Sequence, residues 1–282
     1  NINELANALK PVVLPGEPEQ TARRSARREF PTDIARLSLG WHIPGDSHPD
    51  KAALVFFGTV LSYSQLMARV GRLAARLAGL GVGKGDRVVV CMQNCPQLVI
   101  AHFAILRANA VVVPVNPMNR RDELAYYVAD SDARVIVSTQ ELLDEIGPHL
   151  GKGLAHCVLG AYSHYLRQAT DLNVPDVVRA PPKAIANGAV ASWSAALGAG
   201  HAPGAHAAGP DDLAVLPYTA GTTGHPKGTM LTHANLLATS TGACAWIQSS
   251  SEAVVLGVLP LFHLTGMQAN MNVPIQLGGT TV

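Results

Sequence analysis

One segment of the sequence combines glycine, threonine and lysine in a pattern that favours phosphate binding. Residues 218–228 read YTAGTTGHPKG. Glycine lets a backbone turn tightly and approach a ligand closely, and successive N–H groups in such a turn form a concave site for an anion. The threonine hydroxyls and the lysine ammonium add further donors. The candidate phosphate-binding residues are Thr219, Gly221, Thr222, Thr223, Gly224 and Lys227.

The order of residues distinguishes this loop from a Walker A loop. A Walker A loop would need glycine in place of Pro226 and serine or threonine in place of Gly228. The apolar run at 213–218 predicts a buried strand before the loop, as expected for a phosphate loop in an α/β sheet. A plain surface turn is the alternative, but eleven residues in this order favour a phosphate site, with a triphosphate as the natural ligand.

The segments around the loop alternate between short apolar runs and helical patterns. Besides 213–218, strands are expected at 53–57, 87–92, 110–115, 134–138 and 254–260. Ser62 and Gln65 have the spacing of a capping box, and Asn94 with Pro96 indicates a second helix start. This alternation predicts an α/β fold with largely parallel sheets. The strands are apolar throughout, so both faces of the sheet should be covered.

A change of composition divides the chain. Residues 183–212 are rich in alanine, glycine, proline and histidine, which is typical of a linker, with one helical turn expected around 193–197. The predicted organisation is therefore a tail with a short helix at 1–44, a first α/β lobe at 45–182, this linker, and the start of a second lobe at 213–282.

Composition and charge exclude several classes of function. The formal net charge is +1, so no global basic field exists for nucleic acid or an anionic membrane. No apolar run reaches about 18 residues, so no transmembrane helix is expected. Four cysteines without a C-x-x-C pair indicate reduced thiols in a cytoplasm, and no spacing indicates a metal site. The abundance of alanine and arginine is typical of bacterial chains. The sequence does not predict an oligomeric state.

The loop and its neighbours resemble a known superfamily. YTAGTTGHPKG is similar to the signature of the adenylate-forming (AMP-binding) enzymes, usually YTSGTTGxPKG, with Ala220 in place of a serine. Further segments resemble the N-terminal region of these enzymes in order, although Asn109 stands where glycine is common. They are HPDKAALVFFGTVLSYSQL, GVGKGDRVVVCMQNCPQ, ILRANAVVVPVNP and MLTHANL. The resemblance covers most of residues 45–282 and implies the layered α/β fold of the N-terminal domain.

A second motif points to the acyl-CoA synthetase branch. LPLFHLTG at 259–266 is similar to the segment beside the acyl pocket of those enzymes. The resemblance implies that Phe262 and His263 lie at the substrate carboxylate, and Gly266 and Met267 are small or adaptable pocket residues. Without the resemblance, His263 would be interpreted as a packed core histidine. Residues 253–282 contain no Asp or Glu to pair with an ammonium group, so a fatty acid is expected rather than an amino acid.

The resemblance implies a fatty-acid–CoA ligase that uses ATP, Mg²⁺ and coenzyme A. A carboxylate attacks the α-phosphate and releases pyrophosphate, and the thiol of coenzyme A then attacks the acyl-adenylate. Lys227 and His263 are the catalytic candidates, with Lys227 stabilising the departing pyrophosphate. The alternatives are an aryl-acid or amino-acid adenylating enzyme, and a non-catalytic module that binds a nucleotide or an acyl group.

The resemblance also implies motifs that the sequence does not contain. Enzymes of this superfamily carry, further downstream, a glutamate for the metal, an aspartate for the ribose and a C-terminal lysine. None of these motifs occurs after Phe262. We therefore expect an N-terminal fragment, truncated at the C-terminus, which by itself completes neither half-reaction.

Overall fold

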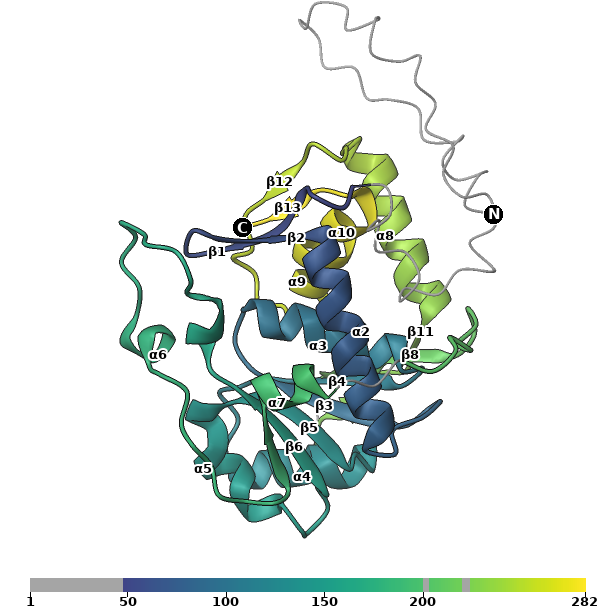
Figure 1. Ribbon diagram of the computed structural model, residues 1–282. Helices are drawn as coiled ribbons and strands as arrows, with labels where there is room; N and C mark the ends of the chain where they lie inside the picture. Colours follow the sequence, from purple (N-terminus) through teal and green to yellow (C-terminus); the bar gives the residue numbers. More distant parts are fainter. Residues whose placement is uncertain (1–47, 200–202, 220–223) are drawn as a thin grey trace, which may run out of the picture.

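The computed structural model describes residues 48–199, 203–219 and 224–282 (Figure 1). The predicted tail at 1–44 and the candidate residues Gly221, Thr222 and Thr223 lie outside the described residues. Within the described part, the strands form a seven-stranded sheet, a four-stranded sheet and a two-stranded ribbon. Most strand pairs of the largest sheet are parallel, which confirms the predicted fold class.

The larger sheet has the strand order β11-β8-β4-β3-β5-β6-β7. Its strands are β3 (Arg87–Cys91), β4 (Val111–Val115), β5 (Val135–Thr139), β6 (His156–Gly160), β7 (Val190–Ser192), β8 (Leu213–Val215) and β11 (Leu231–Thr232). All neighbours pair in parallel except β11 with β8. Every residue of β4 and β5 is buried, as expected for a parallel sheet covered on both faces.

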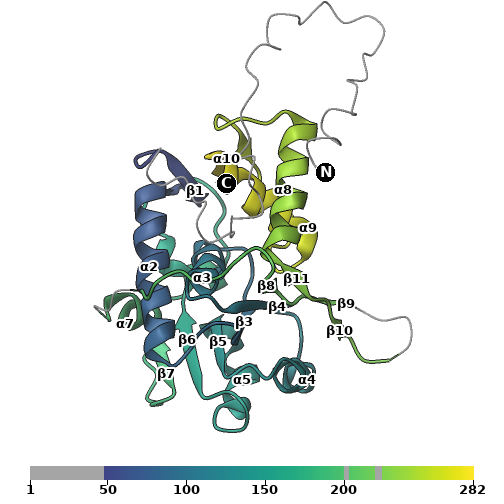
Figure 2. The same cartoon turned by 90° about the vertical axis from the view of Figure 1, so that its right-hand side faces the viewer.

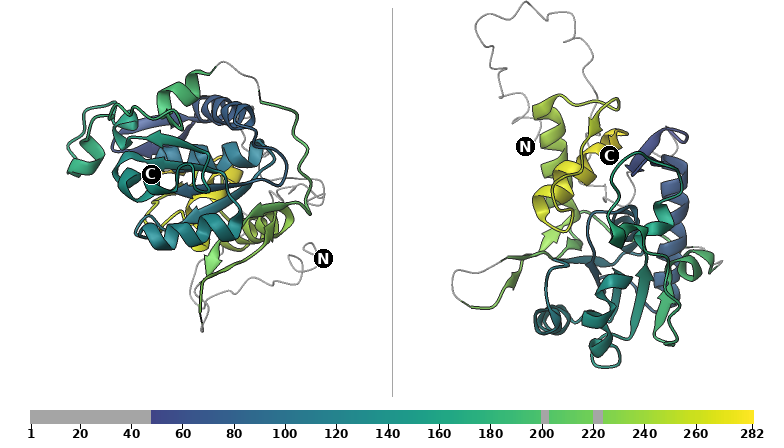
Figure 3. Two further views of the ribbon diagram at one scale, coloured as in Figure 1. Left: turned by 90° about the horizontal axis from the view of Figure 1, so that it is seen from below. Right: turned by 90° about the vertical axis from the view of Figure 1, so that its left-hand side faces the viewer.

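Helices lie on both faces of this sheet (Figure 3). On one face, α3 (Pro96–Arg107) packs against the strands and against α2 (Tyr63–Gly79). On the other face lie α4 (Arg121–Ser131) and the short α5 (Leu143–Ile146). Alternate residues of β3 enter the two cores, as the pleat of a strand requires.

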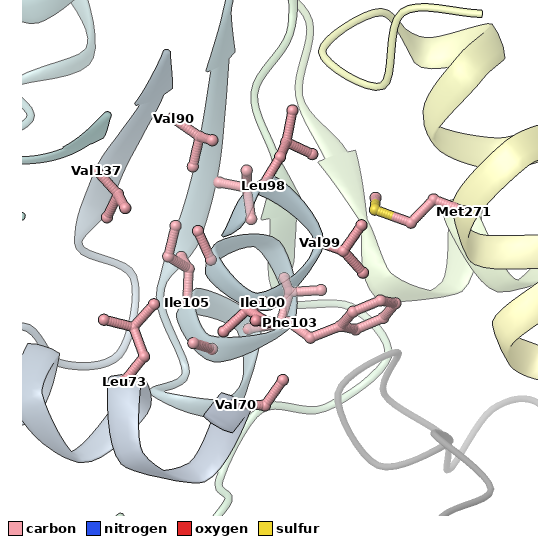
Figure 4. Close-up of a cluster of buried hydrophobic side chains, with 14 of the residues drawn as sticks. Val70, Leu73, Val90, Leu98, Val99, Ile100, Phe103, Ile105, Val137 and Met271 are labelled. Carbon is pink, nitrogen blue, oxygen red and sulfur yellow. The ribbon is translucent and has the colours of Figure 1, made fainter. Parts of the chain in front are cut away.

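The core on the α3 side joins strands, both helices and the C-terminal helical segment (Figure 4). Val90 and Val137 from the sheet, Phe103 from α3, Val70 from α2 and Met271 all belong to one buried cluster. The C-terminal segment runs through α9 (Leu264–Gly266), a π-helical turn at Met267–Asn272, and α10 (Val273–Leu277). Packing of this segment against α3 fixes the position of the residues that immediately precede it.

The smaller sheet joins the two ends of the described chain. Its order is β12-β13-β1-β2. Its strands are β1 (Ala52–Phe56), β2 (Thr59–Ser62), β12 (Val254–Val255) and β13 (Thr280–Thr281). β1 pairs in parallel with β13, and β8 pairs in parallel with β4 of the larger sheet. Segments before and after residues 183–212 therefore share both sheets, so this stretch does not separate two sheets; it also contains β7 and α7 (Trp193–Gly198).

The remaining helical elements are short, apart from α8. They are α6 (Asp176–Arg179), α8 (His233–Ile247) and 3-10 turns at Gln140–Leu142, Gly147–His149 and Tyr162–Tyr165. The capping box predicted at Ser62 and Gln65 is confirmed at the start of α2. No helix in the described ranges has both the length and the apolar character needed to cross a membrane.

Three local predictions were wrong. The strand predicted over 213–218 ends at Val215, and Tyr218 belongs to β9 (Tyr218–Thr219) of the two-stranded ribbon. Asn94 does not cap α3, whose N-cap residue is Cys95, because the Asn94 side chain bonds to a distant segment instead. The strand predicted over 254–260 ends at Val255, because β13 pairs only with the two residues of β12. The chain then leaves the sheet toward α9.

Asn109 has a backbone conformation that favours glycine. Its φ is 63°, in the left-handed region, where asparagine is one of the few other residues tolerated. Its side-chain Oδ1 also accepts hydrogen bonds from the N–H groups of Ala207 (2.7 Å) and Ala208 (3.0 Å). Asparagine therefore satisfies the turn and also fastens the segment that leads into β8.

Candidate functional site

The described ends of the glycine- and threonine-rich segment pair as a two-stranded ribbon, which we call the hairpin. Its arms are β9 (Tyr218–Thr219) and β10 (Lys227–Gly228), which pair antiparallel with Lys227 opposite Thr219. Figure 2 shows this ribbon extending from the edge of the larger sheet beside β8 and β11. Directly opposed residues project from the same face of an antiparallel pair. The Lys227 ammonium and the Thr219 hydroxyl, both on exposed residues, therefore act on the same side of the hairpin.

Aromatic residues of α4 hold the hairpin. The Tyr126 hydroxyl donates to the carbonyl of Pro226 (2.7 Å), and the Tyr126 ring stacks on His225 at 5.0 Å between centroids. The Tyr218 hydroxyl donates to the Asp130 carboxylate (2.6 Å). Burial, together with that carboxylate, raises the pKa of Tyr218 above its ordinary value, so the hydroxyl stays protonated and keeps donating. Both arms of the hairpin are thus fixed to α4.

The two described glycines of this segment differ in what a side chain would meet. Gly224 has a φ of +111°, a backbone conformation that side-chain-bearing residues rarely adopt. Gly228 has an ordinary φ, and a Cβ there would lie 3.1 Å from Cδ1 of Leu216, a tight contact to which the Leu216 side chain would have to adjust. Backbone conformation therefore favours glycine at 224 more strongly than packing favours it at 228.

A cavity of about 300 Å³ lies between the hairpin and the Phe262–His263 segment. Thr219 and Pro226 line it from the hairpin, and Phe262 and His263 line it from the opposite side. No Asp or Glu is among its lining residues. The structure therefore brings two separately predicted motifs to one cavity, although Thr219 and Phe262 lie 43 positions apart in the sequence (262 − 219).

Not every candidate residue lines this cavity. Lys227 and Gly224 lie on the hairpin outside the lining, and Lys227 is exposed. Met267 is only 1% exposed and packs in the hydrophobic core with Met271. Gly266 is buried and is not among the lining residues. Phe262 and His263 are thus the acyl-pocket candidates that face the cavity.

His263 is held by three backbone interactions. Its N–H donates to the carbonyl of Pro260 (3.0 Å), and its carbonyl accepts from the N–H of Met267 (2.9 Å). Its Nδ1 accepts from the N–H of Thr265 at 3.4 Å, as the N-cap of α9. Nδ1 is therefore the acceptor nitrogen, and a neutral ring carries its proton on Nε2. The exposed imidazole can donate that proton to an oxygen of a ligand in the cavity.

Gly266 sets the path of this segment. A Cβ at this position would lie 2.1 Å from the carbonyl oxygen of Pro260 and 2.9 Å from that of Leu259. These distances are far below van der Waals contact, and the obstacles are backbone atoms that cannot rotate away. The close approach of α9 to residues 259–260 therefore requires glycine.

Asn94 is a positioning residue that sequence reasoning did not assign to the site. Its Nδ2 donates to the carbonyls of Gly257 (2.9 Å) and Leu259 (2.8 Å). Its Oδ1 accepts from the N–H of Leu261 (2.8 Å). The segment that leads to Phe262 is therefore fastened to the end of β3. The available signal was a polar residue at the carboxyl end of a parallel strand, where α/β sheets place their ligands.

No metal site is evident in the part of the chain that the structure describes. No group of three or more His, Cys, Asp or Glu side chains in those residues could hold a metal ion. The described residues therefore show no such cluster for Mg²⁺, and no step of the chemistry is assigned to it.

Comparison with known proteins identifies the family. The family model described as "AMP-binding enzyme" matches residues 44–282. The chain belongs to this family. It is 34% identical over 243 residues to a long-chain-fatty-acid–CoA ligase of Bacillus subtilis, covering 82% of this chain and 42% of the relative. It is 35% identical to the Escherichia coli O6:H1 protein of the same name, with 82% and 43% coverage.

A solved structure supports the same assignment. A long-chain-fatty-acid–CoA ligase from Archaeoglobus fulgidus superposes with a TM-score of 0.69 at 25% identity, covering 88% of this chain and 47% of that one. The family membership confirms the resemblance carried by the loop, and the superposition confirms the fold class. The chain spans less than half the length of the two curated relatives and of this solved chain.

Proposed function

We propose that the protein containing this chain activates a fatty acid with ATP and transfers the acyl group to coenzyme A. The support is the cavity at which the hairpin faces Phe262 and His263. One wall carries the Thr219 hydroxyl of the proposed phosphate-binding hairpin, and the other carries the His263 imidazole beside the Phe262 ring. A carboxylate bound between them would lie next to the α-phosphate that it must attack.

The proposed first step uses the hairpin to position and neutralise the triphosphate. A carboxylate oxygen attacks the α-phosphorus, the bond from that phosphorus to the bridging oxygen of the β-phosphate breaks, and pyrophosphate leaves. Among the residues that the structure describes, Thr219 and Lys227 are the proposed donors to the phosphates. The rest of the proposed loop consists of Gly221, Thr222, Thr223 and Gly224. Donors fixed before the reaction stabilise the departing charge without reorganisation. No side chain is needed as a general base in this step.

The proposed acyl side of the cavity fits an uncharged carboxylic acid. His263 Nε2 would donate to the carboxylate, with Phe262 beside it, and Gly266 and Met267 would shape the pocket from behind. An amino acid would bring an ammonium group, which is costly to bury without an anionic partner. Since the cavity lining has no Asp or Glu, a fatty acid fits better than an amino acid.

The second proposed step consumes the acyl-adenylate. The thiol of coenzyme A attacks the acyl carbon, AMP leaves with the electron pair of the C–O bond, and the thiol proton passes to solvent. Mg²⁺ is proposed as an aid to ATP binding in the whole protein. A bacterial and cytoplasmic setting is proposed with this activity, since the curated fatty-acid relatives are bacterial.

Exchange of labelled pyrophosphate into ATP tests the proposal. The full-length protein should be assayed with fatty, aryl and amino acids in parallel. We expect exchange with fatty acids and its loss in His263→Ala. Exchange only with aryl or amino acids would show that the substrate is one of those acids and not a fatty acid. No exchange with any acid, in a protein that binds ATP, would indicate a non-catalytic nucleotide-binding module.

A further inference from the structure

A further cavity lies outside the site above. It has a volume of about 580 Å³ and lies where α2, α7 and the 3-10 turn at Tyr162–Tyr165 meet. Figure 2 shows α2 and α7 side by side on the flank of the molecule, and the two helices are in contact. Three arginines line it: Arg69, Arg72 and Arg167.

The floor of this cavity holds two of the arginines in place. Tyr165 is 1% exposed, and its hydroxyl accepts from Nε1 of the buried Trp193 (3.2 Å). The guanidinium groups of Arg69 and Arg167 each lie 5.9 Å from the centroid of the Tyr165 ring. Arg69 also donates to the carbonyl of Gln65 (2.8 Å), and Arg167 donates to that of His164 (2.9 Å). Two positive charges are thus fixed around one rigid aromatic ring.

The charge of this cavity is not balanced locally. Arg72 follows Arg69 by three residues on α2, so both lie on the same helix face. No Asp or Glu lines the cavity, and the sequence of α2 contains none. None of the three arginines forms an ion pair among the described residues. Like charges held together without a counterion repel each other, so the site favours a ligand of at least two negative charges.

We propose that this cavity binds a phosphate-bearing ligand. Planar guanidinium groups bind phosphate oxygens in pairs, and the hydroxyls of Ser64 and Ser194 in the lining can donate to further oxygens. The volume exceeds what a single phosphate fills, so the phosphate belongs to a larger molecule. A soluble phosphate ester and the headgroup of an anionic lipid share this chemistry. The proposal stands on this cavity alone and does not depend on the hairpin.

Inorganic pyrophosphate tests for a soluble phosphate ligand, and lipid vesicles test for a lipid headgroup. The full-length protein is titrated with pyrophosphate by calorimetry, and sedimented with phosphatidylcholine vesicles with and without phosphatidylglycerol. Arg72→Gln and Arg167→Gln are the test variants. Arg72 makes no side-chain hydrogen bond or ion pair among the described residues, so its replacement should not affect folding. Arg134→Gln removes an exposed guanidinium elsewhere and is the matched control. Lys227→Ala shows how much of the pyrophosphate binding takes place at the hairpin.

Binding of pyrophosphate or of anionic vesicles supports the proposal if the test variants lose that binding. Weakening of pyrophosphate affinity by about tenfold or more in Arg72→Gln, with Arg134→Gln unchanged, indicates a soluble phosphate ligand. Loss of sedimentation with phosphatidylglycerol vesicles in the same variants indicates a lipid headgroup. If both test variants behave as Arg134→Gln in both arms, the proposal is overturned. An effect of Lys227→Ala alone would overturn it while leaving the function of the hairpin intact.

Discussion

The Asn94→Ala substitution tests whether the end of β3 positions the acyl side of the cavity. The Asn94 side chain makes three hydrogen bonds to backbone groups of residues 257–261. At about 1 kcal/mol net for each bond, removal weakens the attachment of this segment by about 3 kcal/mol. Part of this loss is recovered, because water can reach some of the freed groups. Overall stability should therefore fall by less than the attachment does.

The effect on catalysis should exceed the effect on stability. Residues 257–261 lead directly to Phe262 and His263, so loss of the attachment lets both side chains move. A misplacement of about 1 Å at a reacting centre can cost about 100-fold in rate. We expect Asn94→Ala to lower pyrophosphate exchange by about 10- to 100-fold, while urea unfolding shows a loss of about 1–2 kcal/mol.

Gln93→Ala is the matched control, because Gln93 is the exposed neighbour of Asn94. Among the residues that the structure describes, its side chain makes one hydrogen bond, a long one at 4.0 Å to the sulfur of Met118. The full-length variants should be compared with wild type in pyrophosphate exchange at saturating ATP. Equal exchange in Asn94→Ala and Gln93→Ala would show that the attachment of this segment does not position the site.

Further substitutions probe other parts of the account. Lys227→Ala should weaken ATP binding by about 1.5–3 kcal/mol in a calorimetric titration, through loss of a charge-assisted contact; unchanged affinity would remove the lysine from the site. Gly224→Val should also weaken ATP binding, because valine disfavours a φ of +111°; a normal titration would refute that reasoning. Gly266→Ala should lower both exchange and the melting temperature, since its Cβ would meet the carbonyl of Pro260 at 2.1 Å; an unchanged melting temperature would contradict it. Burial, with the charge of His233, lowers the pKa of His102 to about 3 in the folded protein. As the pH falls below about 6.5, the unfolded chain therefore gains a proton on His102 while the folded chain does not, and the free energy of unfolding decreases toward pH 3. His102→Leu should flatten that decline in urea unfolding measured across pH, and an identical decline would exclude His102 as its source.

Local signals predicted most of the elements around the site. The apolar runs gave β1, β3, β4 and β5 to within two residues. For β3, β4 and β5 the reason is that parallel strands buried on both faces have few polar positions. The capping box at Ser62 predicted the start of α2, since its partner Gln65 lies three residues away. The hairpin loop was recognisable for the same reason: its chemistry lies in consecutive residues.

Long-range contacts were not predictable in this way. β13 pairs with β1 across more than two hundred residues, and nothing in either short run identifies its partner. Asn94 has the residue type of a helix cap, but its side chain donates to the carbonyls of Gly257 and Leu259 instead. The contacts of Tyr126 with the hairpin depend on how α4 packs, and the sequence of α4 shows only two adjacent tyrosines.

The central claim is that the cavity between the hairpin and Phe262–His263 holds the acyl-adenylate. A structure of the full-length protein with a non-hydrolysable acyl-adenylate mimic, in which a sulfamoyl group replaces the phosphate, tests it most directly. We predict that the acyl carbonyl lies within hydrogen-bond distance of His263 Nε2, and that the sulfamoyl group lies against the loop between Thr219 and Lys227. A mimic bound elsewhere, with this cavity empty, would contradict the account.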